Sequence, residues 1–205
     1  MRRAAILIFD DVEVLDFCGP FEVLASARVP GGEERAKRPR AFEVVTVAAR
    51  ADIVTCRGGL LVRPNHTFHD CPTPDLIVLP GGYGVERARR DPAVLRWIDL
   101  TVGVATLVTS VCTGAFLLAE AGLLNGRPAT THWVEIPALR AQFPEIDVRD
   151  DYRVVDIGKI ITSAGVSAGL DMALHVISRL HGRDAARETA RSIEYRYEPV
   201  PTLVL

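Results

Sequence analysis

The stretch formed by residues 106–119 constrains the fold more than any other part of the chain. Residues 106–111 are β-branched and apolar enough for a strand buried on both faces. Residues 113–121 are small and apolar, and they suit a helix packed on a sheet. Cys112 stands between the two segments with no proline and no long spacer. We therefore predict that the strand turns directly into the helix at Cys112, as in a nucleophile elbow.

Cys112 has two possible roles in such a turn. A nucleophile at this position projects from the carboxyl edge of the sheet, close to the amides of the helix N-terminus. Those amides favour a thiolate, so we expect them to lower the thiol pKa from its ordinary value of about 8.5. Alternatively, Cys112 is a small buried core residue, as free cysteines often are. The spacing favours the reactive role and leaves the other open.

The remainder of the chain alternates strands with helices. We expect strands at residues 4–9, 42–49, 75–80 and 147–163, the last folded around a hairpin turn at 158–159, with a short strand pair within 52–62. We expect helices from a start at Gly19-Pro20 and over 91–102, 135–143, 166–181 and 183–195. This alternation predicts an α/β fold with a doubly wound, mostly parallel sheet and helices on both faces. The length of 205 residues suits one domain over residues 1–205.

Composition and charge narrow the range of partners. A formal net charge of −2 gives no electrostatic reason to expect nucleic acid or an anionic membrane as a partner. The apolar run at residues 4–9 ends at Asp10, too early for a signal peptide or a membrane span. The cysteines are irregularly spaced, so we expect neither a zinc site nor disulfides, and a cytoplasmic location in which Cys112 stays free. A cluster at residues 66–71, with two histidines, Asp70 and Cys71, is weak support for a metal site.

Three features converge on the carboxyl edge of the predicted sheet, where such folds bind ligands. Cys112 follows its strand, Asp16 follows the first strand, and Gly81-Gly82 follows the strand at 75–80. Asp16 is either a helix N-cap or a carboxyl beside the thiol, whose pKa burial and the thiolate would raise. The two glycines either bring backbone amides close to a reacting atom, as an oxyanion hole requires, or simply form a tight turn.

His132 is a third polar candidate, beside Trp133 in a short extended segment. If this segment returns to the carboxyl edge of the sheet, His132 would act as a base or as a polar wall. A histidine next to a tryptophan is more often a partly buried side chain with its hydrogen bonds satisfied. Both roles stay open on the sequence pattern.

Several motifs occur in order over almost the whole chain. They are Leu15-Asp16-Phe-Cys-Gly-Pro20-Phe-Glu22, Leu79-Pro-Gly-Gly82, Ser110-Val-Cys112-Thr113-Gly114, Ala129-Thr-Thr-His132-Trp133 and Ser163-Ala-Gly165 with Gly169-Leu-Asp171. In these motifs the chain resembles the ThiJ/PfpI superfamily, which is related to class I glutamine amidotransferase domains, and the resemblance implies a flavodoxin-like fold. The tail Ile193-Glu-Tyr195 with two later prolines is also similar to this superfamily.

The details point to one branch of the superfamily. Protease-like and amidase-like members carry histidine directly after the nucleophile, whereas Thr113 follows Cys112 here. The acidic partner in many relatives is glutamate, whereas Asp16 stands here. This combination is similar to isocyanide hydratases and to the ligand-binding halves of AraC-type regulators. The regulators continue into a helix-turn-helix module, and because this chain ends at Leu205 we expect no DNA-binding role.

The resemblance implies cysteine-dependent hydration of a small molecule, from an isonitrile and water to an N-substituted formamide. In this chemistry Cys112 would form a thioimidate and Asp16 would act as acid and base. Gly82, Thr113 and His132 would bind the substrate or its developing charge, without metal or organic cofactor. The resemblance also implies a homodimer. The alternatives are a non-catalytic ligand sensor and a redox or stress protein whose thiolate oxidises.

Overall fold

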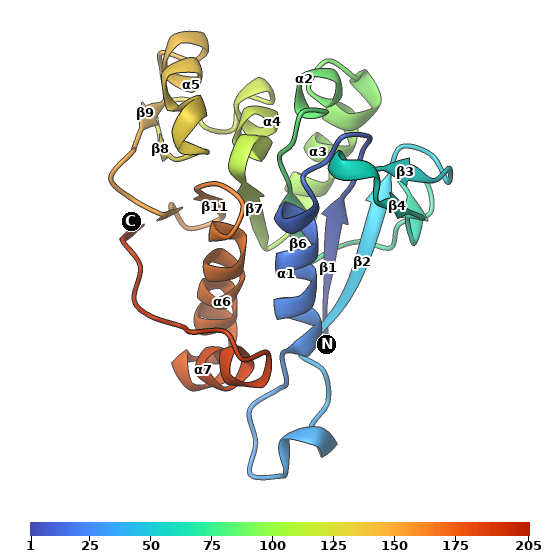
Figure 1. The fold of residues 1–205 in the computed structure, drawn as a ribbon, viewed down its shortest axis with the longest axis vertical. Helices are drawn as coiled ribbons and strands as arrows, with labels where there is room; N and C mark the ends of the chain where they lie inside the picture. Colours follow the sequence, from blue (N-terminus) through green and yellow to red (C-terminus); the bar gives the residue numbers. More distant parts are fainter.

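The central feature of the computed structural model, which describes residues 1–205, is an eight-stranded sheet (Figure 1). Its strand order is β12-β10-β11-β7-β6-β1-β2-β5. The strands are β1 (Arg2–Leu7), β2 (Phe42–Ala48), β5 (His66–Thr67), β6 (Leu76–Leu79), β7 (Leu107–Val111), β10 (Val154–Asp156), β11 (Ile160–Ser163) and β12 (Thr202–Val204). Neighbouring strands run parallel except β10 and β11, which form an antiparallel hairpin. The predicted doubly wound, mostly parallel sheet is therefore confirmed.

Helices cover both faces of this sheet. One face packs against α1 (Val14–Ser26), α6 (Ala168–His181) and α7 (Arg183–Ser192). The other packs against α2 (Val85–Ala88), α3 (Pro92–Val104), α4 (Ala115–Glu120) and α5 (Ile136–Gln142). Two small strand pairs lie outside the main sheet: β3 (Val54–Thr55) with β4 (Leu61–Val62), and β8 (Pro128–Ala129) with β9 (Asp147–Val148). None of the helices combines the length and the apolar character that crossing a bilayer requires.

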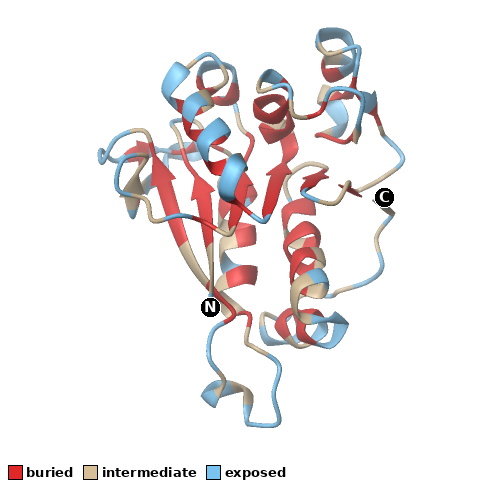
Figure 2. Ribbon diagram, turned by 180° about the vertical axis from the view of Figure 1, so that it is seen from behind, coloured by how far each residue is buried: buried red, intermediate tan, exposed pale blue.

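The core consists of two layers, one on each face of the sheet. In β1, Ala4 and Ile6 point into the layer beneath α1 and α6, whereas Ala5 and Leu7 point into the opposite layer. This division follows from the two-residue side-chain period of a strand. All four side chains are at most 1% exposed, which is why the central strands read as continuous apolar runs (Figure 2).

The first helix differs from the sequence prediction in a way that matters for the site. It begins at Val14, so Pro20 lies inside the helix and not at its start. A proline there lacks the N–H that would otherwise bond to the carbonyl four residues earlier, which belongs to Asp16. The prediction that Asp16 precedes the helix or caps it is wrong, because Asp16 lies in the first turn and Glu13 occupies the N-cap position.

Three strand features were not captured by the sequence pattern. The expected strand at residues 147–163 is divided: β9 pairs with β8, and only β10 and β11 form the hairpin. The C-terminal segment adds β12 beside β10, and β5 adds a two-residue edge beside β2. Strands of two or three residues depend on a preformed neighbour, and this explains why local sequence alone does not reveal them.

Candidate active site

Cys112 occupies a sharp turn between β7 and α4. Its φ is +58°, a left-handed conformation that costs a non-glycine residue about 1–3 kcal/mol. Two hydrogen bonds hold its backbone there: the Cys112 amide donates to the Ala164 carbonyl at 3.1 Å, and the Thr131 hydroxyl donates to the Cys112 carbonyl at 2.8 Å. The side chain is 7% exposed. The structure thus places Cys112 in a strained strand-to-helix turn of the kind that presents nucleophiles.

Asp16 lies beneath this turn and is fully buried. The Gly81 amide donates to Asp16 Oδ2 at 2.9 Å, whereas Asp16 Oδ1 has no partner within hydrogen-bonding geometry. The Cys112 thiol is close enough to Asp16 for each group to affect the pKa of the other. A buried carboxyl oxygen without a partner is costly, and a catalytic role is one reason for such a group to be retained.

The electrostatics of this pair are dominated by burial. Burial raises the pKa of Asp16 from 3.8 to about 7. Burial, and next the charge of Asp16, raise the pKa of Cys112 to about 12. The amides of Thr113 and Val166 favour the thiolate, but they do not outweigh desolvation. The expected lowering of the Cys112 pKa is therefore wrong, and near neutral pH Asp16 is the group of this pair that gains or loses a proton.

Gly81 and Gly82, which follow β6, pack closely against the segments that follow β1 and β7. A side chain on Gly81 would place its Cβ 2.5 Å from Thr113 Oγ1 and 2.8 Å from Asp16 Oδ2. Gly82 has a φ of +125°, and its amide donates to Thr113 Oγ1 at 3.0 Å. Both glycines are thus required for close approach, and both amides are already engaged with site side chains.

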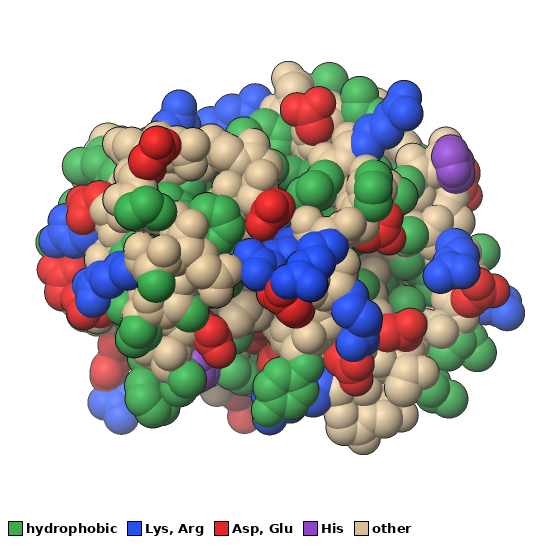
Figure 3. Space-filling model, turned by 90° about the horizontal axis from the view of Figure 1, so that it is seen from above, with side chains coloured by type: hydrophobic (Ala, Val, Ile, Leu, Met, Phe, Trp, Pro, Cys, Tyr) green, Lys and Arg blue, Asp and Glu red, His purple; other side chains and the backbone are tan.

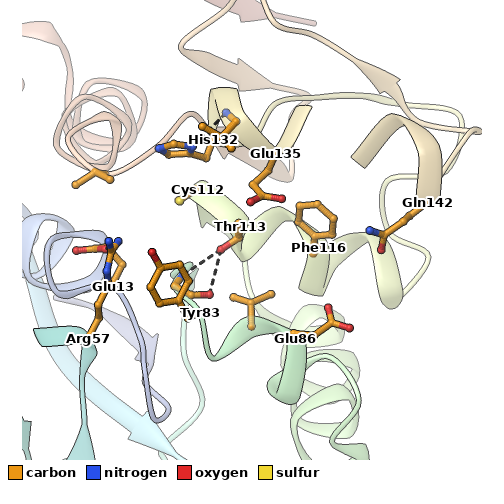
Figure 4. A pocket seen from close by; sticks show the side chains of 14 residues that line it. Glu13, Arg57, Tyr83, Glu86, Cys112, Thr113, Phe116, His132, Glu135 and Gln142 are labelled. Carbon is orange, nitrogen blue, oxygen red and sulfur yellow. Dashed lines mark hydrogen bonds and ion pairs between the residues drawn. The ribbon is translucent and has the colours of Figure 1, made fainter. Parts of the chain in front are cut away.

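A pocket of about 460 Å³ opens above Cys112 (Figure 4). Its lining combines aromatic, acidic and polar side chains with one arginine: Glu13, Arg57, Gly82, Tyr83, Val85, Glu86, Cys112, Thr113, Phe116, His132, Val134, Glu135, Gln142 and Val166. The face of the molecule seen from above carries basic, acidic and hydrophobic side chains interspersed (Figure 3). A cavity of this size suits a small molecule.

Comparison with known proteins identifies the family. The DJ-1/PfpI family matches residues 2–179. This chain belongs to the DJ-1/PfpI family. It is 39% identical over 200 residues to an isonitrile hydratase of Pseudomonas putida, a match that covers 96% of this chain and 80% of that protein. A crystal structure of a ThiJ/PfpI family protein from Pseudomonas syringae superposes with a TM-score of 0.83 at 32% identity, covering 97% of this chain and 76% of the other.

The chain is also similar to transcriptional regulators. The HTH-type transcriptional regulator GbdR of Pseudomonas aeruginosa is 26% identical over 194 residues, which is 95% of this chain. The match spans 51% of the regulator, so this chain corresponds to about half of that protein. Family membership alone therefore does not separate catalysis from ligand sensing.

His132 lines the pocket of this DJ-1/PfpI domain, and its ring is held in place. The Val134 amide donates to His132 Nδ1 at 3.3 Å, and the ring lies in contact with Gly165. A Cβ on Gly165 would come within 2.0 Å of His132 Cδ2. The histidine thus has a local hydrogen-bond partner and also lines the pocket, and its action as a base stays a prediction.

The loop between β11 and α6 contributes functional groups that the sequence patterns missed. The Ala164 carbonyl accepts from Cys112, and the Val166 amide faces the thiol. Val166 has a φ of +50°, a strained value for a β-branched residue. The available signal was Gly165, which follows the strand next to β7 and so had to lie at the same edge of the sheet.

The other histidines lie outside the pocket. His66 is 3.6 Å from Asp70, and this cluster does not bring together three residues that could hold a metal ion. His175 Nε2 lies 2.6 Å from Oδ2 of the buried Asp156, and His181 packs edge-on against Phe42. These contacts are structural.

Proposed function

We propose that this protein hydrates small isocyanides to N-substituted formamides at Cys112. The observation that carries the proposal is the pairing of a buried carboxyl, Asp16, with a thiol held at a strained turn below a small-molecule pocket. The 39% identity to an isonitrile hydratase over 96% of the chain supports the same chemistry. The reaction needs one nucleophile and one group that both gives and takes protons, and this pair supplies both.

In the first step, Cys112 Sγ attacks the terminal carbon of the isocyanide. The S–C bond forms while Asp16 delivers a proton to the same carbon, giving a thioimidate in which carbon is double-bonded to nitrogen. The attacking form of the pair carries one proton in total, on the carboxyl, with the charge on sulfur. The Thr113 and Val166 amides stabilise that sulfur charge.

In the second step, water attacks the thioimidate carbon. One water proton reaches the substrate nitrogen through Asp16, which first accepts it as a base. The C–S bond then breaks as the new hydroxyl gives its proton to Asp16, releasing the formamide. The thiolate and the protonated carboxyl are restored, and the net change is isocyanide plus water to formamide. Asp16 and water supply every proton transfer, and the backbone amides of Thr113 and Val166 stabilise the charge on sulfur.

Three further residues complete the proposed site. Thr113 is held by the Gly82 amide and lies beside the attacking sulfur, where its hydroxyl and amide can orient the substrate. Gly82 acts mainly by positioning Thr113, because its amide is already used. His132 forms one wall of the pocket.

The test is turnover of an alkyl isocyanide, with formamide followed by NMR, in wild type, Cys112→Ser and Asp16→Asn. The proposal predicts catalytic formamide release that both variants lose. Cys18→Ser is the matched control, because Cys18 is half-buried outside the pocket and should retain activity. Turnover in wild type that survives in Cys112→Ser would overturn the assignment of the nucleophile.

A ligand-sensing role is the second candidate, favoured by the match to a regulator over 95% of the chain. It predicts saturable binding in the pocket without a covalent intermediate or product. A redox role fits less well, because burial raises the Cys112 pKa and a protonated thiol oxidises slowly. The expected homodimer and cytoplasmic location remain predictions, and sedimentation velocity would test the dimer.

A further inference from the structure

We infer that the pocket selects isocyanides whose substituent carries an ammonium or another strong hydrogen-bond donor, and that Glu135 binds this group. The inference rests on the proposed function, and it adds the substrate class. It starts from the charges that line the pocket. Three acidic side chains, Glu13, Glu86 and Glu135, face a single arginine, Arg57.

Two of these carboxylates already have cationic partners. Glu13 Oε2 pairs with Arg57 Nη1 at 2.5 Å. This ion pair also occupies the one arginine that lines the pocket. Glu86 pairs with Arg89 at 2.7 Å and with Arg90 on the following turn. Glu135 forms no ion pair, and its side chain makes no hydrogen bond. The uncompensated charge of the pocket is therefore negative and belongs to Glu135.

The arginine on α5 and the arginine that follows β9 already have carboxylate partners. Arg140 pairs with Asp150 at 3.1 Å, and Arg149 pairs with Asp151 at 3.0 Å. Across the pocket, Arg89 is held by Glu86 and lies 5.8 Å from the centre of the Phe116 ring. A cation brought by the substrate would be the first partner of this carboxylate.

The position of Glu135 fits a substituent attached to a reacting group on Cys112. Glu135 ends the short helical turn Trp133–Glu135, which His132 caps. It is half-buried, and its carboxylate points into the pocket between Thr113 and Phe116 (Figure 4). The alkyl part of the substituent would then lie against Phe116, whose ring face also attracts cations. Gln142, on the same wall, offers a second acceptor.

The experiment compares two isocyanides of the same length, 3-ammoniopropyl isocyanide and n-butyl isocyanide. We expect wild type to show a kcat/KM about fivefold to tenfold higher for the ammonium compound, the size of one partly exposed charge-assisted contact. In Glu135→Gln the ratio should fall to about one, while kcat/KM for n-butyl isocyanide stays within about twofold. Glu145→Gln, exposed and outside the pocket, is the matched control and should keep the preference.

A binding measurement separates this inference from the proposed function. NMR titration of N-(3-ammoniopropyl)formamide and N-butylformamide reports pocket selectivity without turnover. Preferred binding of the ammonium formamide, lost in Glu135→Gln, would support the inference even if no isocyanide were hydrated, in which case the proposed function fails. Hydration of both isocyanides at equal rates, unchanged in Glu135→Gln, would overturn the inference and leave the hydratase proposal standing.

Discussion

The Gly81 amide donates a 2.9 Å hydrogen bond to Asp16 Oδ2, joining the loop after β6 to the first turn of α1. This bond fixes one oxygen of the carboxyl and leaves Oδ1 buried without a partner beside Cys112. The glycine permits the contact, because a Cβ there would lie 2.6 Å from the Thr113 amide nitrogen as well as 2.8 Å from Asp16 Oδ2. The orientation of the proposed acid–base group thus depends on a residue with no side chain.

Gly81→Ala should therefore impair the reaction more than it impairs folding. The added methyl group must displace Thr113 or Asp16, and a displacement of about 1 Å in such a site costs about a hundredfold in kcat/KM. Gly103→Ala is the matched control, since no atom lies within 4 Å of its Cβ position. Formamide kinetics and thermal melts would check both variants. Equal activity in the two would contradict the proposed packing role.

The pH dependence of kcat/KM should follow Asp16. The attacking form of the pair carries one proton, and it forms from the doubly protonated pair as pH rises through about 7. Activity should therefore rise between about pH 6 and 8 and then level off, because the second proton leaves only near the Cys112 pKa of about 12. Any residual activity of Asp16→Asn should not show the rise in kcat/KM near pH 7. A wild-type rate that is flat from pH 5 to 8 would argue against this assignment.

Stability should fall as pH rises through the same range. The folded Asp16 holds its proton up to about pH 7, whereas the unfolded chain loses it near 3.8, so the folded state binds more protons between these values. The unfolding free energy should decrease by up to about 4 kcal/mol from pH 4 to 8 through this group. Asp16→Asn should remove most of that decrease, which urea titrations at the two pH values would measure. A variant with the wild-type pH slope would show that other groups dominate.

Arg153 should position the loop that bears Val166. Its Nε donates to the buried Asp171 at 2.6 Å, its Nη2 donates to Ser167 at 2.9 Å, and its carbonyl accepts from Ala164 at 2.9 Å. Arg153→Gln should destabilise the fold by about 1–3 kcal/mol, because Asp171 would keep only the Tyr195 hydroxyl as a side-chain partner.

The activity readout for Arg153→Gln separates positioning from stability. Well below its melting temperature the variant should lose kcat with little change in KM, since the Val166 amide acts on the charge at sulfur. Arg149→Gln, which removes surface pairs only, should change neither value. An unchanged kcat in Arg153→Gln would show that this arginine stabilises the fold without positioning the Val166 amide.

The sequence was sufficient to predict the sheet and the elbow at Cys112, because buried strands appear as apolar runs and parallel strands end at one edge. For Asp16, its position in the sequence left a helix N-cap open, and only the family resemblance favoured a role as partner of the thiol. The sequence was misleading about Pro20, which marks a helix start in most contexts but lies inside α1 here. The sequence also led to the prediction of a lowered thiol pKa. The helix that supplies the amides can be predicted from the sequence, whereas the burial that raises the thiol pKa cannot. Val166 and Glu135 were missed for a related reason: their roles depend on which loops meet above Cys112, and no local motif encodes that.

Intact-mass spectrometry of Asp16→Asn after brief exposure to n-butyl isocyanide would show whether Cys112 forms the covalent thioimidate. Without the acid–base carboxyl, hydrolysis of the thioimidate should slow more than its formation, so a covalent adduct should accumulate. We predict a mass increase equal to the whole isocyanide, located on the peptide that contains Cys112 and absent in the Cys112→Ser double variant. Formamide production by wild type together with an adduct on another residue, or with turnover intact in Cys112→Ser, would contradict it.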